Sequence, residues 1–172
     1  MPLPRVFLIV VLLGLLGFAS CGPGGAGRAS AVADQAQAAM LVELSRLAGA
    51  DFADDGRPSA LCFAVSVGSA PGFDPLEWDE ALPEHLAPVL AADPRFVVSS
   101  RCSADGAESV LGPAGSRAHL LWVDSVTIAA AKVWGTVIVG LSLGESRGYV
   151  CSIIQGDSAS LGLNNCQVAW FS

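Results

Sequence analysis

The sequence predicts an α+β fold, with an N-terminal helix or helices packed on a four- to five-stranded antiparallel meander. Apolar residues between 31 and 48 recur with helical spacing, and the last third of the chain holds four strand-like runs separated by short turns. Turns of that length have no room for a crossover helix, so neighbouring strands should run antiparallel. Helices followed by strands are the element order of α+β domains.

The first 20 residues have the three parts of a secretory signal peptide. Arg5 and the amino terminus supply positive charge, apolar residues and glycines follow from Val6 to Phe18, and small residues end the segment. The apolar core is shorter than the roughly 20 residues that a membrane span needs. We therefore expect residues 1–20 to be removed during export.

The end of this leader, Phe18-Ala19-Ser20-Cys21, resembles the bacterial lipobox, which usually reads Leu, a small residue, Gly or Ala, then Cys. Phe18 stands where that motif prefers Leu. The resemblance implies that the Cys21 thiol takes a diacylglycerol, that cleavage occurs before it, and that the new amino terminus is acylated. Two or more chains such as palmitate hold a soluble domain at a membrane, at about 0.8 kcal/mol per buried methylene. Ordinary cleavage after Ala19, which would release a soluble protein, is the alternative.

Charge and composition limit the partners. After the signal the chain has 16 acidic and eight basic residues, a formal charge of −8. Nucleic-acid binding needs basic patches that neutralise phosphates, so this class is excluded. Glycine-rich residues 21–30 predict a flexible, lipid-anchored tether. Residues 31–172 suffice for a single globular α+β domain, whose expected membrane link is the acyl anchor only.

Four cysteines remain after Cys21 and predict disulfide bonds, because an even number is typical of chains in oxidising compartments. Three pairings are possible, and we favour Cys62 with Cys102 and Cys151 with Cys166. The second pair lies on two apolar runs joined by a turn, as in a bridged hairpin. A zinc site would need short paired cysteine spacings and nearby histidines, which the chain lacks.

The predicted helix covers residues 31–48, with Ser30 as its N-cap and Gly49 at its end. Its larger apolar residues share one face and should pack in the core. They are Val32, Met40, Leu41, Leu44 and Leu47.

The middle of the chain predicts shorter elements. Residues 61–67 alternate with the period of a strand. Asp74-Pro75-Leu76-Glu77 is typical of a helix start, and Pro83 and Pro88 should divide the segment after it into short pieces. Further along, the sequence predicts a short strand, a long loop and the four strands of the meander. Their ranges are 96–102, 103–117, 120–128, 132–143, 149–155 and 164–171.

Few residues could act in acid–base catalysis, because the chain has two histidines, His85 and His119. Gly156-Asp157-Ser158 begins like the nucleophile loop of trypsin-like serine proteases, and His119, Asp124 and Ser158 follow the order His, Asp, Ser. The match ends after three residues. His119 and Asp124 also lie too close together in one predicted strand to form a triad with Ser158. We interpret residues 156–162 as a hairpin turn and assign no catalytic residue.

The acidic clusters give no metal site either. Asp51, Asp54 and Asp55 resemble the opening of a calcium loop, but Ala53 and Cys62 stand at its third and twelfth positions, where oxygen ligands belong. A second cluster lies on the predicted helix after residue 74, with no partner group, and is interpreted as solvated surface. Its members are Asp74, Glu77, Asp79, Glu80 and Glu84. The sequence therefore predicts no metal and no cofactor.

Four tryptophans, Trp78, Trp122, Trp134 and Trp170, could stack on a sugar or a peptide. Three of them lie on predicted strands, where packing in or beside the core is the usual role of an indole ring. A binding face is the alternative interpretation.

From about Ala60 to the end, the chain looks like small exported bacterial proteins of uncharacterised function. The likeness consists of the cysteines at the first two strands, the terminal meander and the ending Trp170-Phe171-Ser172. It transfers no functional residue. A cystatin-like or nuclear-transport-factor-like arrangement of a helix on a sheet would fit, and such shapes host binding proteins and enzymes alike.

Together these observations predict a lipid-anchored protein of the cell envelope that faces the periplasm or the cell exterior. The expected role is a non-enzymatic module that binds an envelope protein or a small ligand. A small periplasmic hydrolase using Ser158 or an acidic pair is the alternative, which the scarcity of histidine disfavours.

Metabolic labelling of cells with palmitate tests whether Cys21 carries a lipid anchor. Cells fed the label should incorporate it into the wild-type protein, and Cys21→Ala should abolish incorporation because the thiol that carries the diacylglycerol is gone. An unlabelled wild type, or label that survives in the variant, would disprove lipidation at Cys21.

Overall fold

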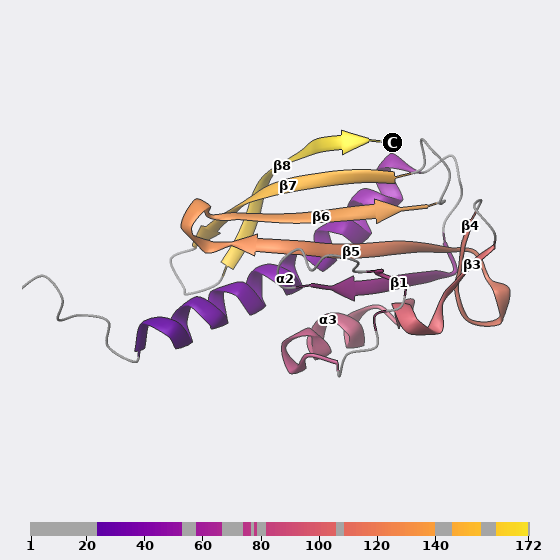
Figure 1. Ribbon diagram of the computed structural model, residues 1–172, viewed down its shortest axis with the longest axis horizontal. Helices are drawn as coiled ribbons and strands as arrows, with labels where there is room; N and C mark the ends of the chain where they lie inside the picture. Colours follow the sequence, from indigo (N-terminus) through magenta and orange to yellow (C-terminus); the bar gives the residue numbers. More distant parts are fainter. Residues whose placement is uncertain are drawn as a thin grey trace, which may run out of the picture. The chain divides into compact units, whose positions relative to one another are not determined.

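The computed structural model describes residues 24–52, 58–66, 74–76, 78, 82–105, 109–139, 146–155 and 161–171 (Figure 1). The chain divides into two compact units, Met1–Ala31 and Val32–Ser172. The second unit contains the sheet, its core and the candidate functional site. The leader, Cys21 and Ser158 lie outside the described residues.

Helix α2 spans Gly24–Asp51, so it begins earlier and ends later than the predicted range of 31–48. Residues 24–30, predicted to belong to a flexible tether, are therefore helical. Three of these seven residues are glycines, which disfavour a helix, so the extension depends on propagation from the packed part of α2, helped by Ala26, Arg28 and Ala29. The expected stripe does face the core, with Met40, Leu41 and Leu44 fully buried.

The main sheet is mixed and has six strands, which corrects the prediction of four or five antiparallel ones. Its strand order is β2-β1-β5-β6-β7-β8. The bounds are β1 Ala60–Val65, β2 Phe96–Val98, β5 Ala118–Thr127, β6 Lys132–Ile138, β7 Ser146–Gln155 and β8 Leu161–Phe171. Strands β5 to β8 form the predicted antiparallel meander, whereas β1 runs parallel to both of its neighbours.

The parallel pairing follows from the long connection between β1 and β5, which gives the chain room to return. This connection contains the 3₁₀-helix η2 (Glu84–Leu86) and helix α3 (Ala87–Ala92), which are short, as the prolines predict. All six residues of β1 are buried, and its continuous apolar run is typical of a central parallel strand. Asp74 accepts a hydrogen bond from the Leu76 amide at 2.9 Å, but residues 75–76 form a turn and not the predicted helix start.

A second sheet of two strands, β3 (Ser103–Asp105) and β4 (Ser109–Leu111), lies within the range predicted to be a loop. Val110 of β4 is fully buried against Cys62 and Leu120 of the main sheet. Strands β3 and β4 thus cover part of the sheet face that points away from α2.

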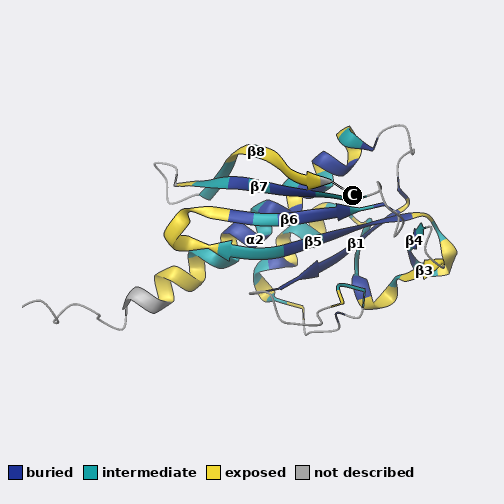
Figure 2. Ribbon diagram, turned by 45° about the horizontal axis from the view of Figure 1, so that its top comes forward, coloured by how far each residue is buried: buried dark blue, intermediate teal, exposed yellow. Residues whose placement is uncertain are grey.

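Helix α2 packs on the opposite face, which we call the inner face (Figures 1 and 2). The helix packs closely against the sheet at Gly135 of β6. A Cβ added there would lie 2.8 Å from Leu44 Cδ1 and 2.9 Å from Met40 Cε, which is closer than real Cβ atoms come. The core is dense where β5, β6 and β7 cross the helix, and the edge strand β8 is largely exposed (Figure 2).

The last turn of α2 is held to the sheet by polar contacts. Tyr149 is buried, and its hydroxyl donates to Asp51 Oδ2 at 2.7 Å. Burial raises the pKa of the Tyr149 phenol, so the group stays a donor. Arg147 lies 3.3 Å from the same Asp51 oxygen and 4.9 Å above the Phe52 ring. These contacts offset the repulsion between the Asp51 carboxylate and the negative, C-terminal end of the α2 helix dipole.

Two disulfide bonds join Cys62 to Cys102 and Cys151 to Cys166, the two pairs that the sequence favours. The first ties β1 to the segment before β3, and the second links β7 to β8. Two such bonds indicate an oxidising environment outside the cytosol. Among the described residues, no helix has both the length and the apolar character of a membrane span.

The close approach at Gly135 predicts that Gly135→Ala lowers the free energy of unfolding by about 1 kcal/mol, the low end of the usual cost of overpacking, because Leu44 Cδ1 and Met40 Cε are ends of flexible side chains that can shift. Gly162→Ala on β8 is the matched control, because a Cβ there would meet Ile154 at an ordinary 3.5 Å. Urea denaturation measures both. Equal stability of the two variants would contradict the contact.

Candidate functional site

The strand register brings three of the four tryptophans to the outer face of the sheet, the face opposite helix α2. Trp122 of β5 pairs with Thr136 of β6, Thr136 pairs with Gly148 of β7, and Gly148 pairs with Trp170 of β8. Trp134 lies two residues before Thr136 on β6, so it shares the same side. We call the surface formed by Trp122, Trp134 and Trp170 the tryptophan face, and the buried Thr136 and Gly148 lie between these residues in the strand register.

Trp170 lies over Gly148. A Cβ added at Gly148 would overlap Nε1 of the Trp170 indole, so the ring occupies space that any other residue would fill. The Trp170 side chain is nevertheless 44% exposed. Glycine at position 148 therefore makes room for the indole over the sheet, and part of the ring remains exposed.

Trp122 is fixed by hydrogen bonds. Its Nε1–H donates to Ser66 Oγ at 3.2 Å, and the Ser66 hydroxyl donates to the backbone carbonyl of Asp124 at 2.7 Å. Ser66 itself is buried at the end of β1. The indole of Trp122 is thus held in one orientation before any ligand arrives.

Asp124 lies beside these rings because of a bulge in β5. The register passes from Val123 opposite Gly135 to Ser125 opposite Trp134, which leaves Asp124 without a cross-strand partner. Its Oδ2 accepts a hydrogen bond from the Thr136 hydroxyl at 3.0 Å. Burial raises the pKa of Asp124 to about 6, and the hydrogen bond from Thr136 opposes part of that rise. The carboxyl therefore exchanges its proton close to neutral pH.

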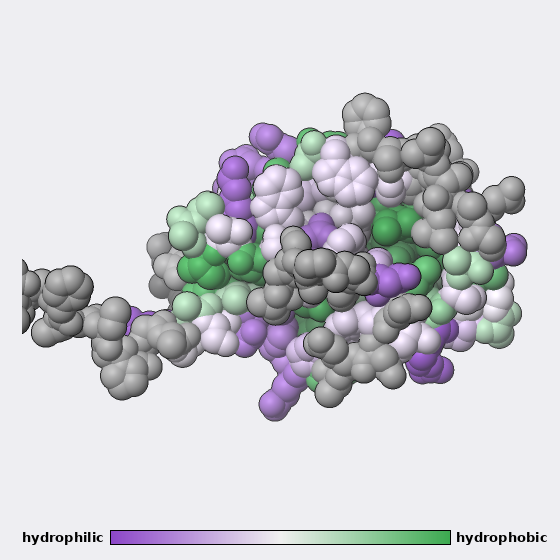
Figure 3. Space-filling model, viewed as in Figure 1, coloured by the Kyte–Doolittle hydropathy of each residue, from purple (hydrophilic) through white to green (hydrophobic). Residues whose placement is uncertain are grey.

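The rest of the outer face is polar but poor in charge. Large, weakly hydrophilic side chains lie over β7 and β8 in this view, next to apolar ones (Figure 3). Hydroxyl and amide side chains occupy outer positions around the rings. They are Ser125, Thr127, Ser152, Asn164 and Gln167. Among the described outer positions of β5 to β8, the charged side chains are Asp124 and Lys132.

The described residues do not assemble a catalytic triad. His119 is fully buried on the inner side, where its ring lies edge-on to Phe52 with centroids 6.0 Å apart. His85 is on η2, with Nε2 3.1 Å from Gln37 Oε1 and Nδ1 3.8 Å from Asp34. In the described ranges no group of three or more histidine, cysteine or acidic side chains could hold a metal ion.

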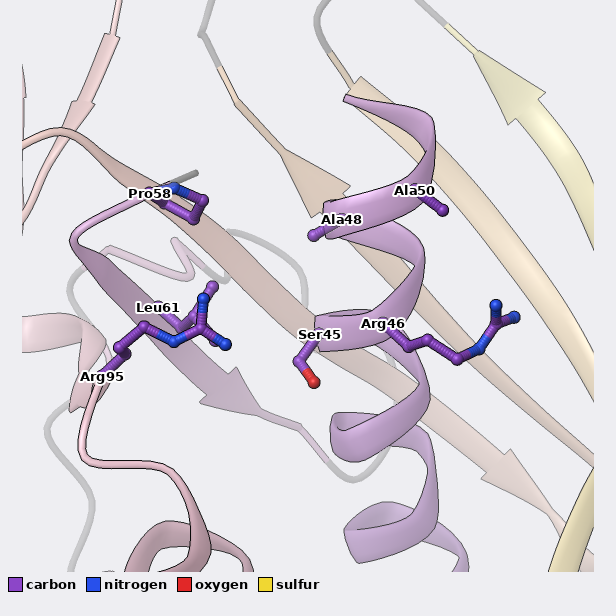
Figure 4. Close-up of a pocket in the computed structure, with 8 residues that line it drawn as sticks. Ser45, Arg46, Ala48, Ala50, Pro58, Leu61 and Arg95 are labelled. Carbon is purple, nitrogen blue, oxygen red and sulfur yellow. The ribbon is translucent and has the colours of Figure 1, made fainter. Parts of the chain in front are cut away.

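A hollow of about 690 Å³ lies between the last turns of α2 and strand β1 (Figure 4). Ser45 and Arg95 point toward it, whereas Arg46 points away. Both arginines are already paired at 2.6 Å, Arg95 with Asp93 and Arg46 with Glu43. The hollow therefore offers little unpaired charge to a ligand and is a weaker candidate than the tryptophan face.

Comparisons of the chain with protein-family models, with curated proteins and with solved structures find no match. Its function is therefore argued from its own geometry.

Sequence reasoning identifies the tryptophans but not the residues that position them. Ser66, Thr136 and Gly148 are common residue types in unremarkable contexts, and each acquires a role only through strand register. Of these three residues, Gly148 alone could have been singled out from the sequence, because a glycine inside a strand often marks a place where another group packs closely against the backbone. The partner in that approach is not visible in the sequence.

The raised pKa of Asp124 predicts a pH dependence of stability. An ordinary aspartate titrates near 3.9 in the unfolded chain, so the native state binds the proton more tightly, and its stability falls as the pH rises from about 4 to 6. Two pKa units would be worth ~2.7 kcal/mol, and partial exposure reduces the expected change to roughly 1–2 kcal/mol.

Asp124→Asn should remove this contribution while keeping an acceptor for Thr136. Urea denaturation of both proteins at pH 4 and pH 7 measures the difference. Parallel pH profiles for the wild type and the variant would contradict a raised pKa at Asp124.

Proposed function

We propose that the chain is an exported, lipid-anchored protein of the cell envelope that acts as a non-enzymatic binding module. The tryptophan face contacts its ligand or partner. The leader and the lipobox-like Cys21 support export and anchoring, and the two disulfides support an oxidising location.

The observation that carries the proposal is the fixed arrangement of indole rings on one face of the sheet. Trp122 is held by Ser66, and Trp170 is seated on Gly148. Tryptophan supplies more binding energy at interfaces than most residues do. Rings fixed in advance lose little conformational entropy when they bind.

A hydrolase has less support from the geometry. His119 is enclosed in the core, and the Thr136 hydroxyl that bonds to Asp124 belongs to a residue only 1% exposed, so neither side chain can reach a substrate. Ser158 lies outside the described residues. The binding module is therefore the function that the described geometry supports best.

Co-sedimentation with envelope material tests whether the protein binds an envelope component through the tryptophan face. The full-length protein, purified in detergent, is mixed with envelope fragments from which lipid has been extracted, so that the acyl chains have nothing to enter. We expect the wild type to sediment with the fragments. Gly148→Ala should reduce the bound fraction severalfold, because the new Cβ displaces Trp170.

Gly162→Ala is the control, since it adds the same methyl group to β8 without a clash. It should bind like the wild type. If wild type and Gly148→Ala bind equally, or neither binds, the tryptophan face is not the binding site.

A further inference from the structure

We infer that the turn between β5 and β6, residues 127–132, inserts its apolar tip into the lipid bilayer that holds the acyl anchor. This inference rests on the lipid anchor of the proposed function and not on the tryptophan face. It adds a second membrane contact to the acyl anchor, which the sequence predicts as the only one.

The turn is exposed along its whole length and is apolar at its tip. Every residue from 127 to 132 is exposed, and Ile128 is 38% exposed. Hairpin turns usually consist of glycine, asparagine, aspartate, serine or proline. This turn reads Ile128-Ala129-Ala130-Ala131, although Ala131 adopts a left-handed conformation with φ of 49° that favours glycine or asparagine. It therefore lacks the polar residues that are typical of a turn facing water.

More apolar surface lies next to the turn. The Ile153 amide donates to the Ala131 carbonyl at 2.8 Å, so the end of β7 adjoins the tip. The next residue on β7, Ile154, is 44% exposed. Figure 3 shows apolar side chains gathered at the left of the view, over the end of the sheet where β5 turns into β6. The apolar character thus extends beyond one isolated side chain.

The packed part of helix α2 begins at the same end of the sheet (Figures 1 and 2). Met40 lies against Gly135, and Asp51 contacts Arg147, which pairs two residues further along β6. The helix therefore runs away from the β5–β6 turn. Val32 lies about 12 Å along the helix before Met40, and β6 begins about 10 Å before Gly135. The start of the packed helix and the turn are thus at similar levels along the sheet.

The anchor is close to this end of the domain along the chain. Cys21 precedes Val32 by 11 residues, which span at most about 40 Å when fully extended. The residues from Gly24 onward belong to α2 and rise only about 1.5 Å each. Acyl chains on Cys21 would therefore keep the start of the packed helix, and the turn beside it, near the bilayer surface.

The charges are distributed in a way that permits this contact. The processed chain has a formal charge of −8, which anionic lipid repels. Residues 21–33 and 125–139 nevertheless contain no acid, and their charged residues are Arg28 and Lys132. A lysine at the base of an apolar tip can place its ammonium group among lipid phosphates while its methylene groups stay with the tip. The parts nearest to the membrane are therefore neutral to weakly basic.

Other occupants of the tip fit less well. A second copy of the chain would bring a second charge of −8 to the interface. A specific protein partner needs about 800 Å² of matched surface on each side, and the turn offers one large apolar side chain, Ile128. A bilayer needs no matched shape, because it takes up apolar side chains in proportion to the area they bury.

Fluorescence quenching in vesicles tests the inference. The acylated full-length protein is reconstituted into phosphatidylcholine vesicles, with an environment-sensitive fluorophore attached to the thiol of Ala129→Cys. Ala104→Cys is the matched control, because Ala104 is exposed on β3, near the start of β5 and so at the other end of this strand. We expect lipids with shallow nitroxide groups to quench the label at position 129 at least twofold and the label at position 104 by less than a tenth.

A substitution in the tip tests whether its largest side chain inserts. Ile128→Ser, combined with the label at position 129, should reduce the quenching about threefold, because most of the apolar area of the tip is lost. Val42→Ser removes an aliphatic side chain that is 50% exposed in the middle of α2 and should leave the quenching unchanged. Both side chains are exposed, so circular dichroism and urea denaturation should show that each variant is folded.

Separate outcomes distinguish the tip from the anchor. If the acylated protein stays on the vesicles but the labels at positions 129 and 104 are quenched equally, the inference is wrong and the anchor stands. The same conclusion follows if Ile128→Ser leaves the quenching unchanged. If the wild type carries no palmitate and does not bind the vesicles, the anchor of the proposed function fails, and the inference fails with it.

Discussion

The close approach of helix α2 to β6 at Gly135 is the contact on which the rest of the domain depends. Without a side chain at that position, Met40 and Leu44 reach the sheet and the helix covers the inner face. The buried leucines and valines beneath it supply most of the hydrophobic stabilisation, at about 25 cal/mol per Å² of apolar surface. A helix seated on one face also means that functional side chains on β5 to β8 can be presented on the other.

The opposite, outer face of the sheet has a covered part and a more exposed part. Near β1 it is closed by β4, whose Val110 is buried against Cys62 and Leu120, and the disulfide from Cys62 to Cys102 holds the covering segment in place. Further toward β8 the same face carries indole rings and polar groups. The covered part of the outer face thus forms a second, smaller apolar cluster besides the main core under α2. Covalent bonds help to hold the covered half, because few residues are available to pack there.

Local patterns in the sequence are sufficient to predict the helix, the Cys151–Cys166 pair and the terminal meander, since each depends on residues close together in the chain. The Cys62–Cys102 pair joins residues 40 positions apart and follows as the pairing of the two cysteines that remain. The position of β1 is not predictable in the same way. Its run Ala60-Leu61-Cys62-Phe63-Ala64-Val65 fits an alternating strand, although its continuous apolar character is typical of a buried parallel one. The bulge at Asp124 is equally hidden, because an irregularity in register depends on the opposing strand. The candidate site depends on both features, so the sequence can name its tryptophans but not assemble them.

The edge strand β8 shows why recognition should use the face and not the edge. Residues 161–171 contain no charged side chain, and Val168 and Trp170 are exposed, a combination that usually invites pairing with another chain. The two register shifts against β7 interrupt the regular ladder, and Asn165 adopts a left-handed conformation with φ of 48°. Bulged, strongly twisted edges are poor templates for an added strand. The Cys151–Cys166 disulfide lies at the second of these shifts and ties β8 to β7 there, and Trp170 stays seated on Gly148. Of the three tryptophans on the outer face, Trp170 is therefore the one that is exposed, while Trp122 and Trp134 are half-buried.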